Sequence, residues 1–481
     1  MSQILENLTK KLNACGIHTL RQLGRAVGVY SPTNKKKEEL IADIIAIASD
    51  RADPAEVNHR GAPPKSEEYD KDLLAEVERC RRYYAGLTPD MPAAQAPLPS
   101  GVASPSAKEA GEVFSGVLEN DDKFWFVRTR DMQICPEEDV FVHSSFITRF
   151  KLRAGDFIVC KAARRAQGEP PAAEYIVSVN GVEPESLCRV PFESLTPCYP
   201  DKRLTLEYKG CSLTERAIDL FSPVGRGQRA LVFSPPKAGK TTLLRHIALA
   251  ITKNHPDYRI IAALIDGRPE EVSDFSETLK GAEITYSTFD RGDSYHIRTA
   301  NLALARSKSI AESGGNAVLL LDGITALSRA HANLSHGSGT FGASGTDFQA
   351  LMAVKRYFGA ARNTSGGGSL TIIAAAVIGT GSEFDDAVCE ELRFAANMEI
   401  SLSAELARGR VFPAMDILSS GARREDLLLS PGELDCVCAV RSSLAEGLGA
   451  RDIFGAMSHT QNNAEFVRDG AQILQSIRND R

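Results

Sequence analysis

The residues best suited to chemistry lie in a short loop between an apolar run, ALVF at 230–233, and a helix-like run. In such a loop, backbone N–H groups and a helix N-terminus face phosphates, a lysine reaches the β and γ oxygens, and a hydroxyl meets Mg²⁺. Lys240 and Thr241 have the types and the spacing for the last two roles. We therefore expect an ATP-binding loop made by Lys237, Ala238, Gly239, Lys240, Thr241 and Thr242.

A carboxylate for the metal follows another apolar run. VLLL at 318–321 ends in Asp322, and a buried parallel strand delivers such a residue to the carboxyl edge of its sheet. Thr241 and Asp322 are therefore the expected Mg²⁺ residues. The strict loop pattern has a glycine where Ser234 stands, so a chance match is the alternative, and Asp322 argues against it.

Aromatic residues near the amino-terminal third offer a different chemistry. In DKFWFVR at 122–128, Phe124 and Phe126 share one face of a strand and Trp125 takes the other. Exposed aromatic rings offer flat faces for stacking. The alternative is that these rings belong to a core. Both faces of one strand cannot be core, so we expect one aromatic face to be exposed.

The length and the changes in composition along the sequence predict several domains. Helical periodicity over 1–50 predicts a small N-terminal bundle, and 51–110 reads as a Pro/Ala-rich linker with one charged helix. Short strand-like runs over 111–182 predict a small barrel, followed by a connector over 183–205. Over 206–481, strand runs alternate with helix patterns, which favours a parallel sheet flanked by helices.

The strand runs themselves can be located. The expected barrel strands are 112–118, 124–128, 139–142, 156–162 and 174–179, and the expected sheet strands are 230–233, 260–265, 318–321, 370–376 and 398–402.

Composition limits the function classes only weakly. The 481 residues include 62 acidic and 56 basic side chains, a net charge of -6, so nucleic-acid binding must rest on local features. Ten cysteines occur without a CxxC pair, which favours a reducing cytoplasm. No charged leader opens the chain and no apolar run approaches about 20 residues, so we expect neither secretion nor a membrane span.

Taken together, the motifs resemble the transcription termination factor Rho family from about residue 111 to about 430. The matching segments are FSPVGRGQR at 221–229, SPPKAGKT at 234–241, LIDGRPEEV at 264–272, LLDGIT at 320–325, KRYFGAARN at 355–363, GSLTIIA at 368–374 and RVFPAMD at 410–416. The resemblance implies an OB or cold-shock-like RNA-binding barrel and an α/β RecA-like P-loop ATPase domain. It also implies a homohexameric ring that hydrolyses ATP on single-stranded RNA and releases the transcript from RNA polymerase.

The resemblance further implies roles for single residues. Arg268 matches an arginine beside the family's catalytic glutamate, Arg423 matches the arginine finger of a neighbouring subunit, and Arg410 matches a second interfacial arginine. Without the resemblance, Arg423 would be read as a solvated surface residue. For RNA contacts, the resemblance implies Phe124, Phe126, Arg128, Phe141, Lys355 and Arg356. Its barrel aromatics would stack on single-stranded RNA, at about 1–3 kcal/mol per base, and Arg128 would add a cation. A family tyrosine on the last barrel strand is replaced by Ala173.

Other positions depart from the family. Gly267 stands where the family has its water-activating glutamate, and Gly323 follows the metal aspartate where P-loop ATPases also keep one. In the channel loops, Thr340 and Glu383 replace lysines. Hydrolysis is then expected to be slow unless Glu270 or Glu271 substitutes.

Three functions remain open at this point. The first is an RNA-stimulated ATPase and terminator. The second is a ring that holds RNA and nucleotide and regulates without hydrolysis, which the altered positions favour. The third, a rotary ATP synthase subunit, would leave the aromatic barrel unexplained.

Overall fold

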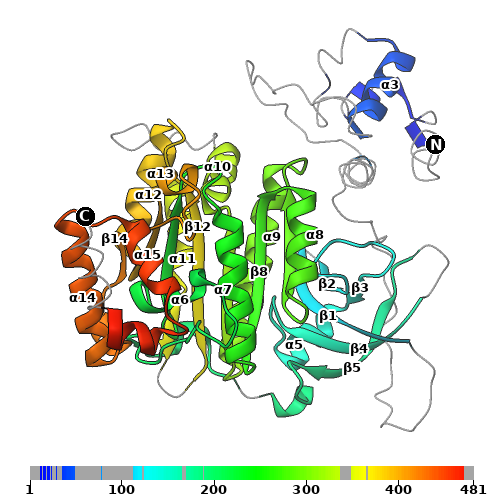
Figure 1. Cartoon of the computed structure of the whole chain (residues 1–481). Helices are drawn as coiled ribbons and strands as arrows, with labels where there is room; N and C mark the ends of the chain where they lie inside the picture. Colours follow the sequence, from blue (N-terminus) through cyan, green and yellow to red (C-terminus); the bar gives the residue numbers. More distant parts are fainter. Residues whose placement is uncertain are drawn as a thin grey trace. The chain divides into compact units, whose positions relative to one another are not determined.

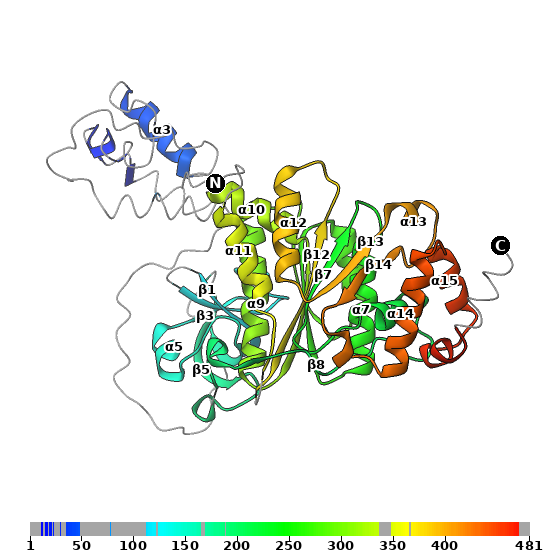
Figure 2. The same ribbon diagram turned by 90° about the vertical axis from the view of Figure 1, so that its left-hand side faces the viewer.

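The computed structural model describes residues 112–470 except 122–123, 165–168, 188, 336–347 and 365–366, together with scattered positions of 11–48 and Val77. The chain divides into two compact units, Met1–Glu109 and Ala110–Arg481. Figures 1 and 2 show both units from two sides.

In the first unit, one helix has defined ends, α3 (Lys37–Ala48). Its apolar side chains belong to a buried cluster made by Leu12, Leu20, Leu23, Val29, Leu40, Ile41, Ile44, Ile47 and Val77. The other helices of the expected bundle stay a prediction. The expected linker and charged helix over 51–110 lie outside the described residues, Val77 apart.

The second unit begins with a closed five-stranded barrel of order β1-β2-β3-β5-β4, as the short strand runs predicted. Its strands are β1 (Glu112–Asp121), β2 (Phe124–Arg128), β3 (Val140–Val142), β4 (Phe157–Ala163) and β5 (Ala172–Val179), and helix α5 (Ser144–Phe150) joins β3 to β4. Inward-facing residues such as Leu118, Val127 and Ile158 form the barrel core. Two short 3-10 turns follow, η1 (Pro184–Ser186) and η2 (Phe192–Ser194).

The rest of the second unit is a sheet of order β14-β13-β7-β12-β10-β8-β9, parallel except for β14. The strands are β7 (Arg229–Ser234), β8 (Tyr258–Gly267), β9 (Glu283–Thr288), β10 (Asn316–Asp322), β12 (Ser369–Val377), β13 (Met398–Leu402) and β14 (Met415–Ala422). The short β11 (Arg362–Thr364) pairs with β12, and β6 (Pro197–Cys198) pairs with β11. The helices are α6 (Leu213–Phe221), α7 (Lys240–Asn254), α8 (Pro269–Thr278), α9 (Asp293–Glu312), α10 (Ile324–Ser335), α11 (Phe348–Gly359), α12 (Glu383–Ala395), α13 (Ala404–Arg408), α14 (Pro431–Ala445) and α15 (Ala450–Ser458), with η3 (Glu425–Leu427).

Helices cover both faces of this sheet (Figure 2). Because side chains alternate along a strand, Val232 of β7 joins the apolar cluster shared with α6, α7, α8, α14 and α15. Leu231 and Phe233 join the opposite cluster, shared with α9, α10, α11 and α12. The predicted α/β layering is therefore confirmed. The described residues contain no helix long and apolar enough to cross a membrane.

Four strands were not predicted from the sequence: the very short β6 and β11, and the longer β9 and β14. The two longer ones lie at the ends of the strand order. Their sequences, EITYST and MDILSSGA, carry several polar residues, because an edge strand packs on fewer neighbours than a central one. The apolar runs that were predicted became the central strands.

Candidate functional site

The phosphate-binding loop lies where β7 ends and α7 begins. Gly239 precedes the first helical residue, Lys240, and adopts a left-handed conformation with φ 96°, which glycine reaches without strain. No side chain caps the first turn of α7. Its backbone N–H groups and the positive end of its dipole are therefore available to an anion.

The two expected Mg²⁺ residues meet at this loop. The Thr241 hydroxyl donates to Asp322 Oδ2 at 2.9 Å, and Asp322 Oδ1 forms an ion pair with the Lys240 amine. Asp322 ends β10 and is buried at the carboxyl edge of the sheet. Hydroxyl and carboxylate oxygens are the ligands that Mg²⁺ prefers, so these two residues fit that ion. When bound, it would neutralise charge on the phosphates.

A cavity of about 40 Å³ opens beside the loop. Its lining includes Lys240, Thr241, Asp322 and the end of β8, and also Glu271 in the first turn of α8. The neighbouring Glu270, which the sequence could not distinguish from Glu271, is not part of the lining. The structure thus places Glu271, one of the two alternative glutamates, in the cavity beside the phosphate-binding loop.

The two glycines that stand where glutamates were expected differ physically. A Cβ at Gly267 would make ordinary contacts, 3.8 Å from Leu264 Cβ and 3.9 Å from Val272 Cγ2. Gly323 has φ +99°, and a Cβ there would lie 2.4 Å from the carbonyl oxygen of Ile265. The first position can hold a side chain, and the second cannot without a backbone shift.

The three expected arginines do not converge within one chain. Arg268, the residue before α8, and Arg410, in the loop after α13, are exposed. The Arg423 backbone N–H donates to the carbonyl oxygen of Asn397, whose side chain binds the first residue of β7, Arg229. Arg423 therefore lies at the opposite end of β7 from the phosphate-binding loop.

The length of β7 fixes how far apart these two ends are. Its six residues span roughly 17 Å at about 3.3 Å per residue. Burial, and then the charges of Arg423 and Arg362, lower the pKa of Arg229, which places Arg423 beside the start of the strand. Arg423 could therefore act on a phosphate only if that phosphate were held by another subunit.

The barrel aromatics form a cluster on the outer face of β2 and β3. The Phe141 ring meets Phe124 at 6.2 Å and Phe126 at 5.9 Å between centroids, in edge-on arrangements. Phe124 and Phe141 are half-buried, whereas Phe126 is 3% exposed. Trp125 faces the barrel core, as the alternation predicted. The expectation that Phe126 presents a free face is corrected, since Phe141 covers it.

Arg128 also differs from its expected role. Its side chain is buried, with Nε 2.5 Å from Glu119 Oε2 and Nη1 2.7 Å from Asp139 Oδ2. Burial disfavours its charge, but these two carboxylates outweigh that effect and hold the pKa of Arg128 above its usual value. The guanidinium lies 4.9 Å from the centre of the Phe126 ring. Arg128 therefore supports the aromatic cluster from beneath instead of offering a surface cation.

Two residues of the last barrel strand, β5, differ in exposure. Ala173, expected in place of a family tyrosine, belongs to the barrel core and is 9% exposed. Tyr175 lies on the outer side, 57% exposed and paired in register with Lys161 of β4. Sequence reasoning missed Tyr175 because irregular pairing between β4 and β5 breaks the alternation of this strand.

The expected channel residues lie on α11 and α12. Lys355 forms an ion pair with Glu391 of α12, while Arg356 is exposed. Glu383, exposed, is the first residue of α12. Thr340 lies outside the described residues.

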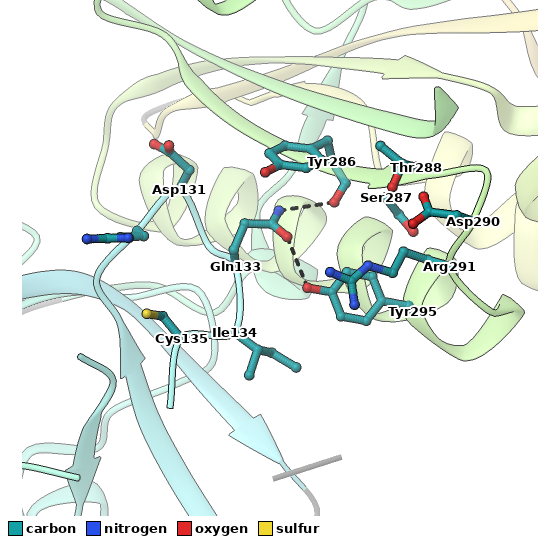
Figure 3. A pocket seen from close by; sticks show the side chains of 11 residues that line it. Asp131, Gln133, Ile134, Cys135, Tyr286, Ser287, Thr288, Asp290, Arg291 and Tyr295 are labelled. Carbon is teal, nitrogen blue, oxygen red and sulfur yellow. Dashed lines mark hydrogen bonds between the residues drawn. The ribbon is translucent and has the colours of Figure 1, made fainter. Parts of the chain in front are cut away.

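A second cavity, of about 330 Å³, lies on the seam between the barrel and the sheet domain (Figure 3). Gln133, from the β2–β3 loop, donates to the Tyr286 carbonyl at 3.0 Å and accepts from the Tyr295 hydroxyl at 3.0 Å. Nearby, Arg298 of α9 donates to Glu119 Oε2 at 2.5 Å. The same carboxylate oxygen thus joins the sheet domain to Arg128 beneath the aromatic cluster.

Comparisons with known proteins agree with these two sites. The Rho termination factor RNA-binding domain matches residues 114–185, and the nucleotide-binding domain of the ATP synthase alpha/beta family matches residues 214–422. The second match alone would suit an ATP synthase subunit, but the first would then have no explanation.

Curated relatives extend the likeness over most of the chain. The transcription termination factor Rho of Borreliella burgdorferi is 42% identical over 363 residues, covering 74% of this chain and 70% of that protein. The Rho of Streptosporangium roseum is 42% identical over 365 residues, covering 75% of this chain and 93% of that protein. The chain spans 60% of the longer Rho of Mycobacterium bovis at the same identity. An RNA-binding barrel and a P-loop domain in one chain, with this identity along both, show that the protein belongs to the transcription termination factor Rho family.

Proposed function

We propose that this protein terminates transcription by binding nascent single-stranded RNA in its barrel and hydrolysing ATP in its P-loop domain. The energy of hydrolysis would drive translocation along the RNA and release of the transcript from RNA polymerase. The observation that carries the proposal is the arrangement of Lys240 and Thr241 on Asp322 in a chain that also has a Rho RNA-binding domain. Such a process has its substrates in the cytoplasm.

Within this proposal, Phe124 and Phe141 stack on bases, because their rings are only half-buried and lie together on the outer face of the barrel. Phe126 and Arg128 hold them in position. Lys355 and Arg356 contact RNA in the channel, where Arg356 has the more exposed charge.

In a homohexameric ring, exposed arginines of one subunit would reach the ATP site of its neighbour. Arg423 lies far from its own phosphate-binding loop, so it would act as a finger on ATP held by the neighbouring subunit. Arg410 would line the same subunit interface, and Arg268 would lie beside the phosphates of its own subunit.

The alternative of a ring without hydrolysis rested on Gly267 and on the altered channel positions Thr340 and Glu383. Two observations count against it: the identity to curated terminators, and the presence of Glu271 in the cavity beside Lys240. The proposed function therefore includes turnover of ATP.

The test is an ATPase assay on the full chain with and without a cytosine-rich single-stranded RNA. We expect turnover to rise on adding RNA, within the range of about 1–100 s⁻¹ for enzymes of this kind. Phe124→Ala should reduce the RNA-dependent part and leave the RNA-free rate unchanged. Turnover that RNA does not change would contradict the proposal.

A further inference from the structure

We propose that Glu271 is the catalytic residue that orients and deprotonates the water attacking ATP. This assignment rests on the proposed hydrolysis and identifies the group that performs it. Glu271 is the only glutamate among the described residues that line the cavity beside the phosphate-binding loop. It reaches that cavity from α8, whereas the missing family glutamate would have come from the end of β8, at Gly267.

Helix geometry explains why Glu271 reaches the cavity and Glu270 does not. Arg268 is the residue that precedes α8, and the Glu271 backbone N–H donates to its carbonyl at 3.0 Å, which closes the first turn. Side chains of a helix lean toward its N-terminus, so Glu271 extends back over the turn that follows Gly267. Glu270 is about 100° away around the helix axis at 3.6 residues per turn.

Two other carboxylates line the cavity. Asp322 faces Lys240 and Thr241. Asp266 also lines the cavity, from the end of β8, and an Asp266→Asn variant tests it separately. Glu271 is exposed and makes no ion pair with any residue that the structure describes. It is therefore available to accept a proton.

The chemical step needs one base. The oxygen of a water attacks the γ-phosphorus, and the bond between this phosphorus and the β–γ bridging oxygen breaks. Its electron pair leaves with ADP. The Glu271 carboxylate accepts one proton from the attacking water, and inorganic phosphate is the second product.

The experiment compares Glu271→Gln with its matched neighbour Glu270→Gln in the full chain with RNA. We expect Glu271→Gln to lower kcat about 10²–10⁴-fold with little change in KM, because a base acts on the transition state. Glu270→Gln should stay within about twofold of the wild type, since its side chain lies outside the cavity. Wild-type kcat in Glu271→Gln, or a loss confined to Asp266→Asn, would overturn the assignment.

A rescue distinguishes a catalytic from a merely structural loss. Gly267→Glu adds a carboxylate at a position with room for a side chain. In the Glu271→Gln background it should raise kcat at least about tenfold above that of the Glu271→Gln single variant. Repair of folding could not explain such a gain. Failure of this rescue while ATP still binds would overturn the assignment. A wild-type chain with no RNA-stimulated turnover would instead overturn the proposed function, and the assignment with it.

Discussion

Two cations, Arg128 in the barrel and Lys240 in the P-loop domain, both face carboxylates but differ in what surrounds them. Arg128 is 2% exposed and lies among Glu119, Asp139 and the more distant Asp121. Lys240 pairs with Asp322, and its side chain is 22% exposed at the edge of a cavity. The first cation is enclosed by its partners, and the second can exchange its partner for a phosphate.

The difference shows that residue type alone does not determine a functional role. The sequence made both residues candidates for contact with nucleic acid or nucleotide. Burial separates them. A charge enclosed by fixed partners has a structural role, because its removal leaves a buried carboxylate unpaired, whereas a charge beside an open cavity is available for binding.

The largest expected effect tests the structural role of Arg128. Arg128→Met would leave Asp139 buried without its ion-pair partner and Glu119 with Arg298 alone, and should destabilise the barrel by about 3–5 kcal/mol. The one tryptophan of the chain, Trp125, is partly buried against the barrel core, so its fluorescence in a denaturant titration reports the unfolding of this domain. A barrel of unchanged stability with weaker RNA binding would mean that Arg128 contacts RNA directly.

The next effect should be catalytic instead of structural. Lys240→Ala is expected to lower kcat/KM for ATP about 10²–10³-fold, because it removes the charge that meets the phosphates. The midpoint of denaturant unfolding, followed by Trp125 fluorescence, should not change. Lys237→Ala, a change at an exposed residue of the same loop, should cost less. Unaltered ATP affinity and turnover in Lys240→Ala would contradict the P-loop assignment.

The motor fold could be predicted because its signals are local. An apolar run, a tight loop and a helix follow one another from 230 to 254, and backbone geometry makes this order sufficient for phosphate binding. The partner Asp322 could be found because parallel strands end at one edge. The edge strands β9 and β14 gave no comparable signal, since their polar residues resemble loops.

Burial in the barrel could not be predicted, because it depends on contacts between residues far apart in the sequence. Arg298, which shares Glu119 with Arg128, is 179 residues from that glutamate in the sequence. The two glycines at 267 and 323 likewise looked equivalent, because a backbone angle and a carbonyl of a neighbouring strand decide which can carry a side chain. Long-range packing therefore determined the burial of Arg128 and the space at the two glycines, which the sequence motifs could not predict.

A smaller effect distinguishes the aromatic residues on the surface from the one beneath. Phe124→Ala and Phe141→Ala should each weaken single-stranded RNA binding by about 1–3 kcal/mol without moving the Trp125 transition. Phe126→Leu, which keeps an apolar side chain in the buried position, should cost less RNA affinity than either. Fluorescence anisotropy with a labelled oligonucleotide measures the affinities. Equal losses for all three would mean that the rings bind as one surface.

The smallest expected effect concerns the seam that links the two sites. Glu119 Oε2 accepts from Arg128 beneath the aromatics and from Arg298 of α9, and β9, just before α9, pairs through Thr288 with Gly267 at the cavity. Arg298→Gln should therefore reduce the stimulation of ATPase by RNA by about 0.5–2 kcal/mol, with the RNA-free rate unchanged.

A matched ion pair crosses the same seam away from the aromatics, from Arg153 to Glu312 at 2.9 Å. Arg153 is 45% exposed, so Arg153→Gln should cost at most about 1 kcal/mol of stability and leave the stimulation ratio intact. Measuring both variants for RNA affinity and for the ratio of RNA-stimulated to basal turnover separates coupling from docking. If the two variants lowered the ratio equally, the barrel would be coupled to the motor by rigid attachment alone, and Glu119 would have no special part in it. If only Arg298→Gln lowered the ratio, RNA binding near Arg128 in the barrel would be coupled through Glu119 and Arg298 to ATP hydrolysis near Lys240.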